Sequence, residues 1–488
     1  MPKRSTTLAL VLPSRSPGAP VTRWLYNALR AEILEGRLRP GARLPATRDL
    51  AQQYGLSRGT IVSAFAQLSS EGYVESAVGS GTRVSEVLPD DLLQAGPPRS
   101  FEKVRPRRML SSYGRRVQLF PAYRTRPIRA FRADQPALDL FPTTLWAQLA
   151  ARRMRRATTS LLLGTSPMGH APLREAVADY VRTARGVQCT ADQVAIVSGV
   201  QEALDLVTRL FVDAGDRVCM EDPGYPGAAL AFEARGARVI GLSVDDEGMT
   251  IPRGDARLAY VTPGHQFPLG ISMSLRRRLA LLDWARGAGA IILEDDYDSE
   301  YRYSGRPVPA LQGLDRHGIV LFAGSFSKVL FPSLRLGYLV VPPDLIDVVT
   351  ATLSITSRHA PLIDQAILSD FVAEGHFARH VRRMREIYAE RLSVLLDSAR
   401  ERLTGLLDIR GLEAGLQTAA WLAPGLDAQI AARAAAERDV EVTPLAWYTR
   451  GRRLRVIREG LHLGFAAIDV PEIRRGVRDL AIALESLS

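Results

Sequence analysis

The sequence predicts an α/β protein of two parts, a small helical module followed by a large domain built on a mostly parallel sheet. Three observations lead to this prediction. The chain has 488 residues, more than one ordinary core accommodates. Its front shows helical periodicity, whereas from residue 133 onward short apolar runs alternate with helical stretches. Finally, the formal net charge of +11 is unevenly distributed along the chain.

The composition, with 46% hydrophobic and 24% charged residues, is typical of a soluble protein. Only two cysteines are present, which excludes a disulfide framework and favours a cytoplasmic location. No apolar run approaches the roughly 18 residues of a membrane span, so we expect no membrane partner. No metal site is expected either. We interpret residues 1–21 as a disordered leader, because their apolar stretch LALVL is too short for a signal peptide.

Three helices are predicted at the front, at residues 22–34, 46–55 and 57–72, because each carries apolar residues on one helical face. The last two are joined by the short turn YGLS, which is typical of a helix-turn-helix whose second helix enters the major groove of DNA. Two short strands around a Gly-Ser-Gly turn, Gly79 to Gly81, then form a wing. Residues 22–88 are therefore expected to form a winged helix-turn-helix domain.

Five residues of this domain are candidates for contacting DNA. Ser57 caps the recognition helix, and Arg58 and Thr60 lie in its first turn, where base edges and phosphates come within reach. Arg48 opens the preceding helix near the DNA backbone, and Arg83 lies on the wing. A three-helix protein-interaction module would show the same helix spacing.

The run LRPGARLPATRDLAQQYGLSRGTIVSAFAQLSSEGYVESAVGSGTRV distinguishes these alternatives. It resembles the winged helix of the GntR family almost throughout, including Ser-Arg at the recognition helix and Gly-Ser-Gly-Thr in the wing. The resemblance implies that double-stranded operator DNA is a partner.

A basic linker is predicted at residues 89–132. Residues 98–132 contain eleven Lys or Arg and a single acid, Glu102, whereas residues 133–488 contain 41 basic and 43 acidic residues. A basic front on a neutral body suggests nucleic acid as a partner, although like charges in a solvated linker would also keep it extended. If linker arginines such as Arg105, Arg107 and Arg108 supplied most of the DNA affinity, that affinity would fall steeply with salt.

The body, residues 133–488, is predicted to hold a mostly parallel sheet whose strand ends carry the functional site. The predicted strands are QVAIVSG, RVCMED, ARVIGL, RLAYVTP, AIILEDD, IVLFAG and GYLVVP. Polar or turn-forming residues follow several of them: Gly199 and Val200 at the start of a helix, Tyr225 on a Pro-Gly-Tyr-Pro turn, and Asp295 at the end of a buried strand. Lys328 follows another strand among small and apolar residues.

Pyridoxal phosphate would explain these features together. Its aldehyde forms a Schiff base with an amine, here Lys328, which also makes Lys328 the candidate catalytic residue. A carboxylate, Asp295, would hold the pyridinium nitrogen, Tyr297 would hydrogen-bond the phenolic oxygen, and Tyr225 would stack on the ring. The phosphate would be bound by the amides of Gly199 and Val200, by Ser325 and Ser327, and by Arg335.

Residues 133–488 resemble fold-type I aminotransferases in the runs MGHAPLREAVADY, SGVQEAL, EDPGYPG, VTPGHQFPLG, EDDYDSEYR and GSFSKVLFPSLRLGYLV. Joined to a GntR-type winged helix, they resemble the MocR-type transcriptional regulators along nearly the whole chain. The resemblance implies a smaller C-terminal subdomain, a head-to-tail homodimer, and the cofactor roles given above for Lys328, Asp295, Tyr297, Tyr225 and Arg335.

Two features depart from true aminotransferases. Their Asn-Pro-x-Gly motif is Phe267-Pro268-Leu269-Gly270 here, so contact with the phenolic oxygen passes to Tyr297, with His265 or Gln266 as a possible helper. The late arginine that binds a substrate carboxylate has no clean counterpart, and Arg458 is near the expected place.

The favoured function is a transcription regulator that senses an amine, an amino acid or pyridoxal phosphate itself. The alternative is a working aminotransferase with an accessory DNA-binding domain. Multiple turnovers with amino donors and 2-oxo acids would distinguish the second from the first.

Overall fold

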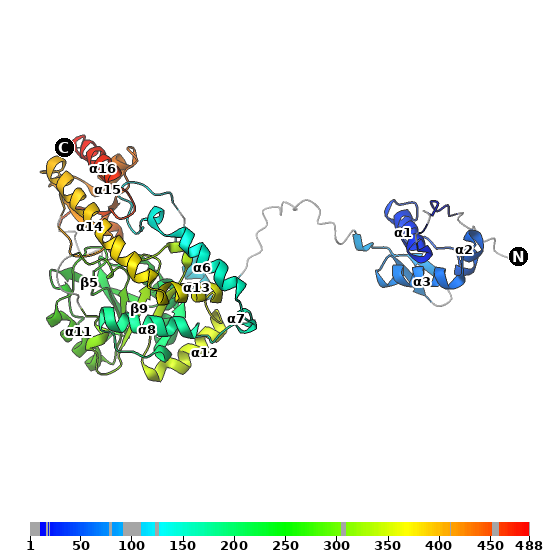
Figure 1. The fold of residues 1–488 in the computed structure, drawn as a ribbon, viewed down its shortest axis with the longest axis horizontal. Coiled ribbons are helices and arrows are strands. Elements are labelled where there is room, and N and C mark those ends of the chain that lie inside the picture. Colours follow the sequence, from blue (N-terminus) through cyan, green and yellow to red (C-terminus); the bar gives the residue numbers. More distant parts are fainter. Residues whose placement is uncertain are drawn as a thin grey trace. The chain divides into compact units, whose positions relative to one another are not determined.

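The computed structural model describes residues 10–15, 18, 20–77, 81–90, 109–122, 126–303, 309–409, 411–450 and 458–487. The chain divides into two units, Met1–Arg108 and Met109–Ser488 (Figure 1). Gly79 and Ser80 of the predicted wing turn lie outside the described residues, as do the linker residues Arg105, Arg107 and Arg108. Across the described ranges, no helix is long and apolar enough to cross a membrane.

Unit 1 has the predicted winged helix-turn-helix fold. Its elements are α1 (Val21–Leu34), α2 (Thr47–Tyr54), α3 (Arg58–Ser70), β1 (Val74–Ala77) and β2 (Gly81–Val84). The two strands are antiparallel, with Val74 opposite Val84. The apolar faces of the three helices meet in one core whose fully buried members include Leu25, Leu29, Leu50, Ile61 and Leu68. Gly55 ends α2 in the left-handed conformation, at φ 63°, which lets the chain turn sharply into α3.

The expected disordered leader differs from the structure in its described part. Leu10 and Leu12 are buried in the core of unit 1. Their backbone is held by α2, because Gln53 donates to the Leu10 carbonyl at 2.7 Å and the Leu12 amide donates to the Tyr54 hydroxyl at 3.0 Å. Two leucines two positions apart on an extended chain point to the same side, so a short apolar run suffices to cover this core. The sequence predicts a leader because the apolar run LALVL is too short for a signal peptide, and no local pattern shows that its leucines pack against α2.

Unit 2 is built on an eight-stranded sheet (Figure 1). Six of its strands, β3, β4, β5, β7, β8 and β9, run in the same direction, while β10 is antiparallel to both its neighbours and β6 is antiparallel to β5. In spatial order the strands are β3 (Val194–Val197), β10 (Gly337–Val340), β9 (Val320–Ser325), β8 (Ile291–Asp296), β7 (Leu258–Val261), β4 (Arg217–Asp222), β5 (Arg238–Asp245) and β6 (Gly248–Met249). The parallel strands end at one edge, where a site is expected in this architecture.

Helices cover both faces of this sheet, as the nearly continuous apolar strands require. On one face lie α9 (Val200–Phe211), α10 (Pro226–Arg235) and α12 (Ile346–Thr356). The opposite face is covered by α8 (Ala171–Arg185), α11 (Leu275–Ala288), α13 (Leu362–Ala373) and the N-terminal part of α14 (His376–Arg402). The remaining α-helices are α5 (Ser112–Val117), α6 (Thr143–Arg155), α7 (Thr159–Leu163), α15 (Ala428–Ala436) and α16 (Val470–Glu485). Short 3₁₀ turns are η1 (Leu138–Leu140), η2 (Ala191–Gln193), η3 (Gln312–Leu314), η4 (Pro332–Leu334), η5 (Pro343–Leu345) and η6 (Leu445–Tyr448).

A second, antiparallel sheet forms the smaller C-terminal part of unit 2. Its order is β11 (Leu407–Ile409), β12 (Gln417–Leu422), β14 (Gly460–Gly464) and β13 (Thr443–Pro444). The long helix α14 packs against α16 beside this sheet (Figure 1).

The predicted linker also differs from the structure in its described part. Arg116 of α5 donates to the carbonyls of Ala234 and Arg235 at the end of α10, at 2.9 and 3.0 Å, so α5 packs on the body. Further along, Ala130 pairs with Val440 and Phe131 with Gly464, and both Ala130 and Phe131 are fully buried. The core of unit 2 therefore begins before residue 133. The arginines of this stretch concealed the pattern, because some of them, such as Arg116 and Arg132, pack against the body through hydrogen bonds and ion pairs rather than through apolar periodicity.

Candidate functional site

The start of α3 presents three of the five predicted DNA-contacting residues, Ser57, Arg58 and Thr60. The Ser57 hydroxyl accepts a hydrogen bond from the Thr60 amide at 3.1 Å and lies 2.8 Å from the Thr60 hydroxyl, which fixes the start of the helix. Arg58 is exposed beside them. Arg48 on α2 is 85% exposed and lies 3.4 Å from the neighbouring carboxylate of Asp49. These two guanidinium groups can turn toward an external anion at little cost.

The wing is attached to the helices through two arginines. Arg83 donates to the Gly41 carbonyl at 3.1 Å, and the backbone of Arg43 pairs with that of Arg83. A Cβ atom added to Gly81 would lie 2.9 Å from the guanidinium of Arg43, so this group covers the start of β2. Sequence reasoning identified Arg83 but missed Arg43, whose position beside the wing follows from pairing between distant segments.

In unit 2, the ends of the parallel strands gather the residues predicted for the cofactor. Asp295 lies at the end of β8, and Lys328 follows β9. Tyr225 follows β4 at the start of α10, and Gly199 caps the N-terminus of α9. The charge of Lys328 acts on Asp295, which indicates that the two side chains are close.

Asp295 is a buried carboxylate with one oxygen engaged and one without a partner. The Tyr260 hydroxyl donates to Oδ2 at 2.7 Å, whereas Oδ1 is buried with no hydrogen-bond partner among the described residues. Burial raises the pKa of Asp295 to about 7, the Tyr260 hydrogen bond opposes this shift, and the charges of Asp296 and Asp298 add to it. Leaving such an oxygen unpaired is costly, so Oδ1 fits a cationic N–H donor, which none of the described residues supplies.

Lys328 is held by Asp134, a residue that the sequence did not identify. Its Nζ donates to the Asp134 carbonyl at 2.6 Å and lies 3.3 Å from Oδ1 of the same residue. Asp134 has a φ of 70°, which is uncommon for a non-glycine residue, and Gln417 Oε1 accepts a hydrogen bond from its amide at 2.8 Å. Burial acts to raise the pKa of the Asp134 carboxyl, but Lys328 and His462 outweigh it and the pKa is lowered.

Tyr297 belongs to a hydrogen-bonded group with His265 and Asp298. Nδ1 of His265 lies 3.0 Å from the Tyr297 hydroxyl oxygen and 3.0 and 3.1 Å from the two carboxylate oxygens of Asp298. We assign the hydrogen to Nδ1, because a carboxylate can only accept. The Tyr297 hydroxyl hydrogen then remains available for an outside acceptor. Burial raises the pKa of Tyr297 well above its usual value, which keeps this hydrogen in place.

Of the two residues named as helpers for Tyr297, His265 is within hydrogen-bond distance of its hydroxyl, whereas the Gln266 side chain bonds the backbone. The Gln266 amide donates to the carbonyls of Pro223 and Phe267, at 2.8 and 2.5 Å, and so joins the two turns of the site to each other. Nearby, Glu221 accepts from the Thr262 amide and hydroxyl at 3.1 and 2.6 Å. These contacts hold the site's backbone.

A glycine turn and an arginine lie together at the place where the sequence predicts a phosphate cradle. Gly199 has a φ of 97°, and a Cβ atom placed on it would lie 3.4 Å from three atoms of the Arg335 guanidinium. The amide of Val200 lies in the first turn of α9, whose N-terminus favours an anion. The Ser325 hydroxyl accepts from the Ser327 amide at 3.1 Å and shapes the loop that leads to Lys328.

Aromatic rings surround the site on the side of the C-terminal sheet. The Phe267 ring is contacted edge-on by four rings, with centroid distances between 5.1 and 6.0 Å, from Tyr225, Tyr297, Tyr448 and His462. Tyr448 and His462 were not identified from the sequence, and they reach Phe267 through pairing of β13 and β14. Arg458, the candidate for binding a carboxylate, lies instead over β11 and β12, where it is 45% exposed and 3.5 Å from Asp408.

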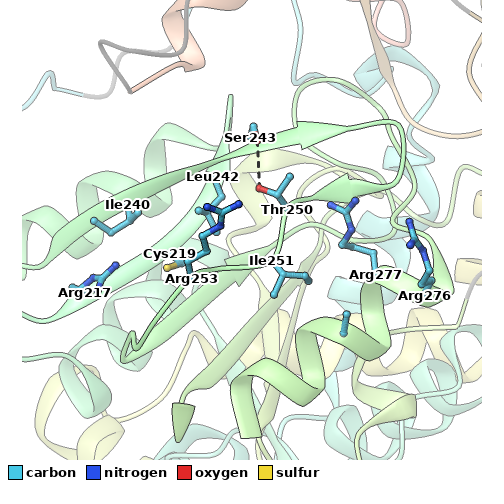
Figure 2. A pocket seen from close by; sticks show the side chains of 11 residues that line it. Arg217, Cys219, Ile240, Leu242, Ser243, Thr250, Ile251, Arg253, Arg276 and Arg277 are labelled. Carbon is cyan, nitrogen blue, oxygen red and sulfur yellow. Dashed lines mark hydrogen bonds between the residues drawn. The ribbon is translucent and has the colours of Figure 1, made fainter. Parts of the chain in front are cut away.

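A separate open pocket of about 730 Å³ lies between β4, β5 and α11 (Figure 2). Arg217, Arg253, Arg276 and Arg277 line it together with apolar side chains such as Ile240 and Ile251. The residues that line it do not include Lys328, Asp295 or any other residue predicted for the cofactor. Arg276 and Arg277 are paired with Glu247, and Arg277 also with Asp245 at 2.9 Å.

Both parts of the chain match models of known families. The model described as bacterial regulatory proteins of the gntR family matches residues 22–84, and the model of aminotransferase class I and II matches residues 135–458.

Full-length relatives share both parts. The chain is 41% identical over 485 residues to a probable rhizopine catabolism regulatory protein MocR from Rhizobium meliloti, covering 97% of this chain and 96% of the relative. It is 31% identical to the HTH-type pyridoxine biosynthesis transcriptional regulator PdxR from Corynebacterium glutamicum, covering 94% of this chain and 95% of the relative. Among solved structures, it is similar to the α-aminoadipate aminotransferase LysN from Thermus thermophilus, complexed with N-(5'-phosphopyridoxyl)-L-leucine. That likeness has a TM-score of 0.67 and 30% identity, and covers 74% of this chain and 92% of LysN.

Proposed function

Because the chain belongs to the MocR-type transcriptional regulators, which join a GntR-type DNA-binding domain to an aminotransferase-like domain, we propose that it senses a primary amine through pyridoxal phosphate held at Lys328. The observation that carries the cofactor assignment is the buried Oδ1 of Asp295, which has no partner among the described residues. A protonated pyridine nitrogen supplies the missing donor. The similar structure of LysN holds a phosphopyridoxyl compound.

The residues around Lys328 supply the other contacts that this cofactor needs. Tyr297 keeps a hydroxyl hydrogen for the phenolic oxygen, since Nδ1 of His265 approaches only the oxygen of that hydroxyl. Gly199, Val200 and Arg335 form the phosphate cradle together with Ser325 and Ser327. Tyr225, on its turn after β4, provides a face for the ring. When bound, the cofactor supplies an aldehyde carbon that holds one primary amine at a time, either Lys328 or an effector.

The contact between Lys328 and Asp134 gives the released lysine a defined partner. When an effector amine takes the place of Lys328, the lysine becomes a free ammonium group that must be solvated or paired. Asp134 offers both a carbonyl and a carboxylate oxygen, at 2.6 and 3.3 Å from Nζ. Release of Lys328 is thereby coupled to the position of Asp134.

Asp134 lies on the segment through which the chain enters the body. The neighbouring Arg132 pairs with Glu441, and Phe131 pairs with Gly464 of β14. A change at Asp134 is therefore transmitted to the chain that leads back to the DNA-binding domain. For regulation, the effector must bind two conformations with different free energies, and a difference of about 1–3 kcal/mol gives roughly 5- to 150-fold changes in operator affinity.

The test is a paired titration of full-length protein loaded with pyridoxal phosphate. One measurement follows the visible absorption of the cofactor as a primary amine is added, and the other follows operator binding in the same samples. Both should change over the same amine concentration range. A spectral change without any change in operator binding would contradict the sensing role, and a protein that develops no cofactor band would contradict the cofactor assignment.

The same samples discriminate between regulation and amino transfer. A working aminotransferase converts many equivalents of amine and 2-oxo acid, with Lys328 moving the proton. We expect at most a slow, incomplete conversion, together with specific operator binding. Rapid multiple turnover without specific operator binding would favour the enzyme. A head-to-tail homodimer is expected for this regulator, and sedimentation of the loaded protein tests for a dimer.

A further inference from the structure

Strand β14 places a histidine in the wall of the site. His462 is fully buried and contacts the Phe267 ring at a centroid distance of 5.5 Å. Its Nδ1 lies 3.1 Å from the Tyr448 hydroxyl, whereas its Nε2 is buried without a partner among the described residues. Phe267 also contacts the rings of Tyr225 and Tyr297, so His462 lies on the same aromatic wall as two of the predicted cofactor residues.

His462 is an uncharged residue at neutral pH. Burial lowers its pKa to about 4, the carboxylate of Asp134 opposes this shift, and the charges of His265 and Lys328 add to it. We assign the Tyr448 hydroxyl as the donor to Nδ1, which places the hydrogen of the ring on Nε2. Nε2–H is then a buried hydrogen-bond donor that has no acceptor among the described residues. Such a group can hydrogen-bond a hydroxyl, a carbonyl or an ether oxygen, but it cannot neutralise an anion.

The remaining charges near Lys328 do not favour an effector carboxylate. Asp134 places a carboxylate beside Lys328, and its lowered pKa keeps it ionised at neutral pH. Two arginines in this part of the body have acidic partners: Arg302 is 2.6 Å from Glu413, and Arg450, two residues after Tyr448, is 2.7 Å from Glu233. Arg335 lies at Gly199, in the phosphate cradle.

We propose that the effector is a primary amine bearing hydroxyl or other uncharged oxygen groups, rather than an α-amino acid. In this proposal His462 determines the specificity, because its Nε2–H hydrogen-bonds such an oxygen. The inference rests on the proposed function, because it concerns the amine that replaces Lys328. It narrows that function to one effector class. The two features that carry it are the buried, unpartnered Nε2 of His462 and the carboxylate that Asp134 places beside Lys328.

The test compares two probes that differ only in the group in question. L-alaninol carries a CH₂OH group where L-alanine carries its carboxylate. Each is titrated into full-length protein loaded with pyridoxal phosphate, and the half-saturating concentration is read from the cofactor's absorption. We expect the value for L-alaninol to be at least about tenfold lower than that for L-alanine. The readout is binding and needs no turnover.

Variants at two positions show which residue sets the preference. The preference is expressed as the ratio of the half-saturating concentration of L-alanine to that of L-alaninol. His462→Arg should lower this ratio by about tenfold or more, because it adds a cation to the wall. His462→Gln keeps an uncharged donor and should retain the preference for L-alaninol. Arg458→Ala, a matched change on the same segment but outside the site, should leave the ratio unaltered.

The outcomes separate this inference from the proposed function. Loaded wild-type protein that favours L-alanine, or a preference unchanged in a folded and loaded His462→Arg protein, would overturn the assignment of His462 while leaving the sensing of amines intact. If His462→Arg does not fold, loss of the L-alaninol preference in His462→Gln would count against a hydrogen-bonding role. A wild-type protein that never takes up the cofactor would overturn both proposals.

Discussion

The recognition face of unit 1, formed by Arg48 and the start of α3, and the proposed cofactor site of unit 2 differ in how their charged groups are solvated. Arg48 is 85% exposed and Arg58 is also exposed, so water solvates their charges until DNA phosphates replace it. Asp295 is only 4% exposed, and one of its oxygens has no partner among the described residues. A solvated cation costs the fold little and accepts many anions, whereas a buried carboxylate costs stability and accepts few partners. Pairing with DNA should therefore cost the first face little, whereas the second site should favour a ligand that supplies a donor to the buried oxygen.

The two regions also differ in how far apart their parts lie in the chain. Ser57 and Thr60, three residues apart, build the start of the recognition helix. Lys328 and its partner Asp134 are 194 residues apart. A change in the first region should therefore have local effects, whereas a change in the second should also alter the response of the whole protein.

The largest effect is expected from Lys328→Ala. Without its amine the protein cannot hold the cofactor covalently, so dialysed protein should lose the visible band completely. Operator binding should then no longer respond to primary amines. Arg253→Ala, an exposed change in the separate pocket, is the control and should retain both properties. An amine response that persists in Lys328→Ala would mean that the sensing site lies elsewhere in the chain.

Asp295→Asn should show how much the buried carboxylate lowers the free energy of unfolding. Because burial raises the pKa of Asp295 to about 7 in the folded protein, the folded state keeps a proton that the unfolded state has already lost. This contribution makes the cofactor-free protein less stable as the pH rises from about 4 to 7. Asn cannot titrate, so between pH 5 and pH 8 the variant should gain up to about 2–3 kcal/mol relative to wild type.

Urea unfolding of cofactor-free protein at the two pH values measures this difference, with the exposed Asp344→Asn as control. The same Asp295→Asn protein should bind pyridoxal phosphate at least about 100-fold more weakly, because Asn leaves the ring nitrogen without a counter-charge. An identical pH dependence in wild type and variant would show that Asp295 is not the titrating group.

The contrast between the regions also explains what the sequence could predict. The three helices and the wing strands of unit 1 follow from local periodicity and capping, and the sequence predicts them to within a few residues. The residues expected to contact DNA stay a prediction. In unit 2, Lys328, Asp295 and Tyr297 could be found because they follow apolar strands. Asp134 and His462 could not, because neither lies in a local motif.

Strand pairing is what brings those two residues to the site. Asp134 is placed by the pairing of Phe131 with Gly464, and His462 by the packing of β14 beside Phe267. Such pairings depend on contacts across hundreds of residues, which periodicity does not report. The leucines of the expected leader were missed for a similar reason, since their burial depends on α2.

Arg58→Ala tests the exposed region. Loss of a base contact at the start of the recognition helix should weaken operator binding by about 1–3 kcal/mol and relax discrimination at one base pair. Electrophoretic or fluorescence titration against the operator and against random DNA measures both effects, with the exposed Arg23→Ala on α1 as control. Equal weakening on both DNAs would instead make Arg58 a phosphate contact. The cofactor spectrum should be unchanged.

The smallest effect is expected from Ser57→Ala, which removes the hydroxyl that accepts from the Thr60 amide at 3.1 Å. Loss of this cap should destabilise the DNA-binding domain by about 1 kcal/mol, because the amide at the start of α3 loses its partner. Calorimetry of the full-length protein should show a lowered transition for this domain, whereas Ser70→Ala at the other end of α3 serves as control. The transition of the body should stay in place, since the contact spans three residues within unit 1. A simultaneous drop in both transitions would show that the two units unfold together, and the local character assigned to the recognition face would then be wrong.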